Sequence, residues 1–341
     1  MFDDFYGNPA VQETLDQMIV QERIPQTMLF AGPEGIGKAT LARRFAARLL
    51  GDAGKIEKDD QSLPGNRALV TEREKLPADK RVDDPLLFSS HPDFVTFPPD
   101  GPLRQISIQQ MRILKDRAQF KPLKGNWRVF LIDHIDRANE QAANSLLKTL
   151  EEPPSHLIVI MTAENAYDLL TTIRSRSVML QFGSLSEADM REFTRTRGLD
   201  HADRRIALAS GSPGMAMSLD LESYDKRRTA MLALLEVASG RAPFAKWTKF
   251  SESLGASKSE KLEYYLKVLY LLLEDLILLQ NGGTAKNFDV RPALESIAAN
   301  VSFEWIRKAV IRVDDLILLL RRNIQKSLAL DSLVVELQEN A

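Results

Sequence analysis

The sequence of 341 residues predicts an α/β protein in which a parallel β-sheet, covered by helices, is followed by a wholly helical second half. Three observations lead to this prediction. Short β-rich runs alternate with helical patterns from Thr27 to Thr162, and a glycine-rich loop separates the first β-rich run from the helical pattern after it. After Gly183 the strand signals fade, and the remaining patterns are those of helices.

The sheet region contains two well-marked helices and four expected strands. One helix begins at Ser107, which stands in capping-box spacing with Gln110. The other covers NEQAANSLLKTLEE, places its apolar residues on one face, and ends before Pro153 and Pro154, which cannot continue a helix. The expected strands are TMLFA (27–31), DFVTF (93–97), RVFLID (128–133) and LIVIMT (157–162).

Residues 51–84 interrupt this alternation. The segment is polar, charged and punctuated by glycine and proline, and it shows no lasting periodicity. We interpret it as a surface insertion that could be mobile. Long helical patterns then run from Tyr224 to Glu339.

The composition is that of a globular protein, with 44% hydrophobic residues and a net charge of -2. The chain has no cysteine, which excludes disulfides and cysteine-bound zinc, and its four histidines lack paired-ligand spacing, so no metal site is predicted. The start, MFDDFYGNPA, does not resemble a signal peptide, and charges interrupt the most apolar window at 264–280. We expect a cytoplasmic protein without membrane contact.

The glycine-rich loop has the pattern G-x-x-x-x-G-K, formed by Gly32, Gly37 and Lys38. Glycines let backbone N–H groups curl round phosphates at a helix N-terminus, and the lysine neutralises phosphate charge. Gly35 adds further freedom to the loop. The strand before the loop and the helix after it are the context that this nucleotide-binding motif requires.

Two residues of this loop and its helix depart from a hydrolytic site. Ala39 stands where a serine or threonine hydroxyl normally binds magnesium, and a methyl group cannot coordinate a cation. Thr40 is one residue later, which rotates its side chain by about 100° along the helix, away from the phosphates.

The expected acidic strand shows a further departure. Asp133 ends an apolar strand and suits a carboxylate near magnesium, although a structural strand-end aspartate is the alternative. His134 follows it, where hydrolytic proteins of this class generally have a glutamate that polarises water, and an imidazole supplies weaker basicity. Asp136 lies beyond the strand end and is interpreted as a loop residue.

Several stretches together resemble the AAA+ clamp-loader family over nearly the entire chain. FDDFYGNPAVQETL resembles the family's N-terminal box, and HPDF resembles its characteristic strand entry. The most specific match is AANSLLKTLEEPP, and TTIRSRSVMLQF is similar to the family's Ser-Arg-Cys segment with serine in place of cysteine. The resemblance implies an AAA+ domain at 1–182 with the insertion at about 51–84, a helical lid at 183–222 and a helical collar at 223–341.

The resemblance also implies roles for single residues. Arg176 matches an arginine that reaches in trans into the ATP site of a neighbouring subunit, although an exposed loop arginine is the structural alternative. Thr162 occupies the family's polar sensor position near the terminal phosphate. Met215 stands where the lid segment often has a phosphate-contacting arginine, and we expect it to be a packing residue. Because the insertion has no cysteine, the zinc module common in the family is not expected.

We therefore expect a clamp-loader subunit of the replicative DNA polymerase III holoenzyme that does not itself hydrolyse ATP. Its loop could still hold ATP or ADP weakly. The implied partners are motor ATPase subunits and a clamp-opening subunit in a hetero-oligomeric ring, with the sliding clamp and primed DNA reached through the complex. One alternative is a working AAA+ ATPase, a motor subunit or a related remodeller, in which Thr40 and Asp136 serve metal and water.

A second alternative is a DNA-binding adaptor that grips primed template through helix N-termini and loop lysines. The basic segment KPLKGNWR, residues 121–128, could touch phosphate in that case. A solvated loop that enters a strand is the simpler interpretation of this segment.

Overall fold

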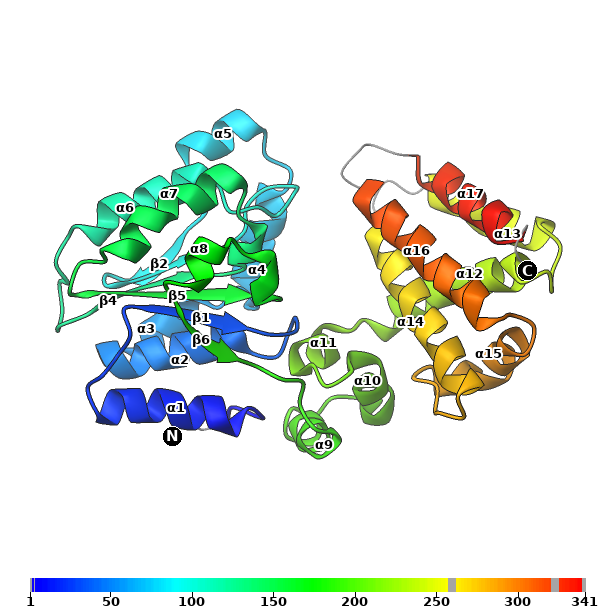
Figure 1. Cartoon of the computed structure of the whole chain (residues 1–341), viewed down its shortest axis with the longest axis horizontal. Coiled ribbons are helices and arrows are strands. Elements are labelled where there is room, and N and C mark those ends of the chain that lie inside the picture. Colours follow the sequence, from blue (N-terminus) through cyan, green and yellow to red (C-terminus); the bar gives the residue numbers. More distant parts are fainter. Residues whose placement is uncertain (1, 3, 257–261, 320–324, 339–341) are drawn as a thin grey trace. The chain divides into compact units, whose positions relative to one another are not determined.

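The structure is a computed structural model that describes residues 2, 4–256, 262–319 and 325–338 (Figure 1). These residues form two compact units. The first unit comprises Met1–Gly198 and Gly211–Met215, and the second comprises Leu199–Ser210 and Ala216–Ala341. The expected lid, 183–222, is thus divided between the two units, and its separation as a third domain stays a prediction. None of the described helices is long and apolar enough to cross a membrane.

The described part of the first unit contains a six-stranded sheet with the order β2-β3-β4-β5-β1-β6. Its neighbouring strands are parallel except for β2 and β3, which form an antiparallel pair. All four expected strands are present, but the edge strands β2 and β6 were missed, because each is short and mixes buried and exposed positions. The strands are β1 (Thr27–Ala31), β2 (Phe88–His91), β3 (Phe94–Phe97), β4 (Arg128–Ile132), β5 (Leu157–Ala163) and β6 (Val178–Gln181).

Helices cover both faces of this sheet, which explains why its central strands are buried throughout and mostly apolar. One face packs against α6 (Ile108–Ala118) and α7 (Glu140–Glu151), and the other packs against α1 (Pro9–Val20) and α2 (Lys38–Leu50), as Figure 1 shows. The expected capping box at the start of α6 is present. Short α8 (Thr171–Arg174) precedes β6, and α9 (Glu187–Thr196) follows it.

The segment 51–84, which we expected to be a surface insertion, contains short helices that its lack of lasting periodicity did not indicate. It forms α3 (Ala53–Ile56), a 3-10 turn η1 (Glu57–Asp59), α4 (Pro64–Arg73) and α5 (Ala78–Asp83). Helices of 4 to 10 residues are too short to show a lasting apolar period. Charged side chains help to attach the segment, because Arg73 pairs with the buried Asp100 at 2.8 Å and Arg43 of α2 pairs with Asp60 at 2.6 Å.

The second unit is helical throughout its described residues, as expected. Its core contains the buried indoles of Trp247 and Trp305 and the apolar face of α14, which includes the apolar window 264–280. The helices are α10 (Ala202–Ala209), the end of α11 (Pro213–Ser218), α12 (Leu221–Ala238), α13 (Ala245–Ala256), α14 (Leu262–Gln280), α15 (Arg291–Ala298), α16 (Phe303–Leu319) and α17 (Lys326–Gln338), with the 3-10 turn η4 (Phe288–Val290).

A buried polar network also stabilises the second unit. The carboxylate of Asp275 is fully buried and accepts hydrogen bonds from the backbone N–H groups of Lys286 and Asn287 and from the Asn287 amide. The Asn287 amide oxygen in turn accepts from Tyr224 and Arg228. These bonds join α12 and α14 to the segment that precedes α15.

Candidate functional site

The phosphate loop lies between β1 and α2, as the sequence predicts. Gly32, Gly35 and Gly37 have φ angles of 149°, 73° and 94°, in the region that glycine adopts without strain. A Cβ atom on Gly32 would lie 2.4 Å from the carbonyl oxygen of Phe182. The loop therefore depends on glycine both for its backbone conformation and for its close approach to the chain after β6.

Lys38 folds back onto this loop. Its Nζ donates hydrogen bonds to the carbonyl oxygens of Gly32 (2.6 Å) and Pro33 (2.7 Å), and the residue is only 5% exposed. Burial lowers the pKa of the Lys38 ammonium, while attraction to the carboxylates of Asp133, Glu164 and others works in the opposite direction. The ammonium thus lies within the electrostatic reach of acidic groups after β4 and β5.

Asp133 follows β4, and both of its carboxylate oxygens have hydrogen-bond donors. Thr162 of β5 donates its hydroxyl to Oδ1 at 2.6 Å, and Gln61 donates its amide to Oδ2 at 2.7 Å. Burial alone would raise the pKa of Asp133, but nearby His134, the Thr162 hydrogen bond and the Arg43 charge together hold that pKa below its ordinary value. The structure therefore places a buried, ionised carboxylate at the expected position, with its oxygens already bonded.

Gln61 was missed by the sequence analysis. It follows η1 in the 51–84 segment, which was interpreted as surface, and no motif marks it. Only the folded chain shows that this segment reaches the end of β4 over a separation of 72 residues. The pairing Arg43–Asp60, one residue before Gln61, attaches the same stretch to α2.

The helix that begins at Lys38 contains a buried arginine, Arg43, close to Thr40. Arg43 is 2% exposed, and its guanidinium lies 3.5 Å from the Thr40 hydroxyl oxygen and contributes to the low pKa of Asp133. Ala39 offers only its methyl group. A protein cation thus supplies positive charge near the Asp133 carboxylate.

The segment Gly211–Met215 covers the phosphate loop. The backbone N–H of Gly214 donates to the Gly35 carbonyl at 2.8 Å, and the Ser212 hydroxyl donates to the Glu34 carbonyl at 2.9 Å. Met215, which we expected to be a packing residue, is 37% exposed. The backbone and Ser212, rather than the Met215 side chain, supply the bonds that fasten this segment to the loop.

Arg176 lies on a different part of the first unit, between α8 and β6. Its guanidinium pairs with Glu151 at 2.7 Å and donates to the Thr172 carbonyl at 2.9 Å, and a third of the side chain is exposed. Neighbouring apolar side chains are also exposed, with Tyr167 at 78% and Met179 at 48%. The surface that carries Arg176 thus combines cationic and apolar groups.

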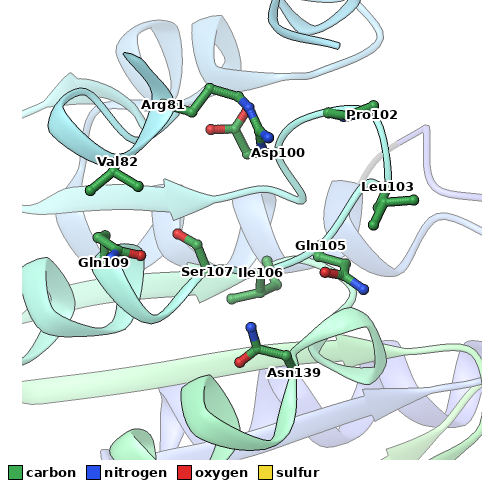
Figure 2. A pocket seen from close by; sticks show the side chains of 10 residues that line it. All are labelled: Arg81, Val82, Asp100, Pro102, Leu103, Gln105, Ile106, Ser107, Gln109 and Asn139. Atoms are coloured by element: carbon green, nitrogen blue, oxygen red, sulfur yellow. The ribbon is translucent and has the colours of Figure 1, made fainter. Parts of the chain in front are cut away.

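Two further features fall outside the expected site. One is a hollow lined by residues such as Arg81, Ser107 and Asn139 (Figure 2), none of which was among the predicted site residues. Its volume is about 190 Å³. It is smaller than the roughly 300–1,000 Å³ of typical ligand pockets. In the basic segment 121–128, Arg128 is buried and paired with Asp93 at 3.3 Å, so this cation serves the fold.

A comparison with known proteins relates the whole chain to replication proteins. The family described as "DNA polymerase III, delta subunit" matches residues 7–186. The delta' subunit of DNA polymerase III from Bacillus subtilis (strain 168) is 24% identical over 341 residues, which cover 97% of this chain and 96% of that subunit. The gamma subunit from Buchnera aphidicola subsp. Schizaphis graminum is 26% identical over 194 residues, and the match covers 57% of this chain and about half, 48%, of that subunit. Among solved structures, a gamma subunit-related protein from Thermotoga maritima has a TM-score of 0.44 and 16% identity, with 95% of this chain and 98% of that one covered.

Proposed function

The chain belongs to the DNA polymerase III, delta subunit family, and on this premise we propose that it is a clamp-loader subunit that assists ATP hydrolysis without performing it. The family membership makes it a clamp-loader family subunit. We propose more specifically that the chain has the same place as the delta' relative, in a ring with motor ATPase subunits and a clamp-opening subunit. The sliding clamp and primed DNA would be met through that complex.

The hydrogen bonds that the Asp133 carboxylate already accepts are the main support for this proposal. Magnesium at a nucleotide site needs oxygen ligands in near-octahedral geometry. Here the Asp133 oxygens already accept from Thr162 and Gln61, and Ala39 has no hydroxyl to offer. A magnesium ion would have to share the Asp133 oxygens with the Thr162 and Gln61 donors and approach the buried charge of Arg43. These residues do not fit a hydrolytic magnesium site.

The residues fit a weakly held ATP or ADP better than they fit magnesium. The glycine loop and the start of α2 provide backbone N–H groups for phosphate oxygens. Binding would require Lys38 to exchange the carbonyls of Gly32 and Pro33 for phosphate. The segment Gly211–Met215, bonded to the loop, would also have to yield, and both exchanges reduce affinity.

Arg176 is the residue proposed to act on a neighbour. It is partly exposed, and its partner Glu151 is also exposed, so a stronger anion can replace this carboxylate without leaving a buried charge unpaired. A transferring phosphate on an adjacent ATPase subunit is such an anion, and a guanidinium stabilises the charge that develops there. Its chemistry is thus exerted in trans.

The first experiment measures magnesium-dependent ATP hydrolysis by the purified chain, alone and assembled with motor and clamp-opening subunits on primed DNA. We expect no turnover by the chain alone. In the assembly, Arg176→Ala should lower turnover by about 10³-fold at the site that receives the arginine. Arg174→Ala is the matched control, because Arg174 is two residues away and its guanidinium lies over the Tyr167 ring. Turnover by the isolated chain would instead identify a motor subunit and refute the proposal.

A second experiment tests the role of Gln61 directly. The double variant Ala39→Thr with Gln61→Ala restores a hydroxyl and frees one Asp133 oxygen. We expect ATP affinity to become magnesium-dependent in the double variant and to be magnesium-independent in the wild-type chain. Equal magnesium dependence in both proteins would show that Gln61 and Ala39 do not determine metal binding.

A further inference from the structure

A group of side chains that could ligate a metal ion lies at the ends of β4 and β5, next to Asp133. His134 and Asp136 follow β4, and Glu164 follows β5. One potential ligand atom from each residue lies within 4.8 Å of the others. The chain brings them together because β4 and β5 are adjacent parallel strands, whose carboxyl ends meet at the same edge of the sheet.

Two polar atoms of this group are buried without a hydrogen bond. Among the described residues, neither Nδ1 of His134 nor Oδ1 of Asp136 has a hydrogen bond, although both are inaccessible to solvent. Native chains normally pair buried polar atoms, so each exception requires an explanation such as an ion. Nδ1 of His134 also faces Oε1 of Glu164 at 3.9 Å. The unpaired atoms and the carboxylate therefore point to a shared ligand that accepts electron pairs.

The donor set restricts which cation fits. One imidazole nitrogen with two carboxylates suits first-row transition ions, whereas magnesium and calcium prefer all-oxygen ligands. The chain has no cysteine that could compete for such an ion. Ligand bonds of about 2.0–2.2 Å require the 3.9 Å separation to close slightly, which rotation of the partly exposed Glu164 side chain allows.

We propose that His134, Asp136 and Glu164 bind a divalent first-row transition ion of the zinc class, with water in the remaining coordination positions. The site uses neither the phosphate loop nor Arg176, although His134 directly follows Asp133, and zinc binding can be measured separately from ATP hydrolysis. Two cations of the chain lie nearby: Arg137 is 3.5 Å from Oε1 of Glu164, and Lys38 is attracted to the same carboxylates. A bound ion would take over part of the role of Arg137 and Lys38 in neutralising these carboxylates. It would also link the end of β4 to the end of β5.

The test is zinc binding by the metal-stripped full chain, measured by calorimetry and by the change in thermal midpoint. We expect one zinc per chain, an increase in Tm with zinc, and no comparable increase with magnesium. Glu164→Gln should weaken zinc binding by about tenfold or more, since even supporting residues of metal sites contribute that much. Nuclear magnetic resonance of the imidazoles should show one histidine perturbed by zinc.

His134→Asn provides the second variant, and His201→Asn is its matched control. Both histidines have left-handed backbones, with φ of 56° and 49°, a conformation that asparagine tolerates. We expect His134→Asn to weaken zinc binding by about tenfold or more, and His201→Asn to bind as the wild-type chain does. The proposal is overturned if the folded wild-type chain binds no zinc, or if neither His134→Asn nor Glu164→Gln changes the affinity.

Discussion

Replacing Gly35 with alanine tests whether the segment Gly211–Met215 stabilises the phosphate loop. An added Cβ at Gly35 would lie 2.4 Å from Oγ of Ser212 and 3.1 Å from the backbone nitrogen of Met215. The first distance is too short for any real contact, so the Ser212 hydroxyl must rotate away, which breaks its hydrogen bond to Glu34. The second distance is tight and involves backbone, so we expect the covering segment to shift and the hydrogen bond from Gly214 to Gly35 to break as well.

The expected loss of stability has two parts. Alanine in the left-handed conformation of Gly35 is destabilised by about 1–2 kcal/mol. Each broken hydrogen bond contributes about 0.5–1.5 kcal/mol, so the total reduction in the free energy of unfolding is about 2–5 kcal/mol. Gly125→Ala isolates the first part, because Gly125 has a similar φ of 70° and no atom within 4 Å of its added Cβ. That control should lose only about 1–2 kcal/mol.

Denaturant unfolding of both variants, followed by circular dichroism, gives the free energies of unfolding. Hydrogen exchange then locates the change, because residues 211–215 should exchange faster in Gly35→Ala and at the wild-type rate in Gly125→Ala. If the two variants lose the same stability and residues 211–215 exchange alike in both, the covering segment does not stabilise the loop and the reasoning is refuted.

Three further predictions concern ionisable groups in the folded chain. Arg73→Ala leaves the buried Asp100 without its partner and should lower the free energy of unfolding by about 3–5 kcal/mol in denaturant titrations, whereas a loss below about 1 kcal/mol would mean that the 51–84 segment is loosely attached. Hydrogen bonding to Arg228 lowers the pKa of Asp289 from 3.8, so Asp289 contributes stability that is present above pH 3.8 and is lost as the pH falls through its folded pKa. Asp289→Asn should therefore be less stable than wild type at neutral pH and show a smaller loss on acidification. Burial raises the pKa of Tyr224 from 10.0 to about 12, so its stabilising effect is complete below pH 10 and is lost as the pH rises toward 12. Tyr224→Phe should unfold with a weaker dependence on alkaline pH, and an unchanged alkaline unfolding curve would contradict this.

Much of the fold of the first unit was predictable because it depends on local patterns. Buried parallel strands are continuous apolar runs, and Ser107 with Gln110 marks the start of α6 through bonds within one helical turn. The phosphate loop was predictable for the same reason, since glycine spacing determines its backbone. Strands β2 and β6 were not, because their mixed burial comes from their positions at the edges of the sheet.

The sequence by itself determined the α/β class, the phosphate loop, and the lack of a hydroxyl group at position 39, where the residue is alanine. Each of these depends on residues that are close together in the chain. Only the tertiary structure decided what surrounds Asp133. Gln61 reaches it from 72 residues away, and no periodicity or motif encodes that contact. The His134, Asp136 and Glu164 group likewise exists only because adjacent strands end at one edge of the sheet, which brings residues of two separate segments within 4.8 Å.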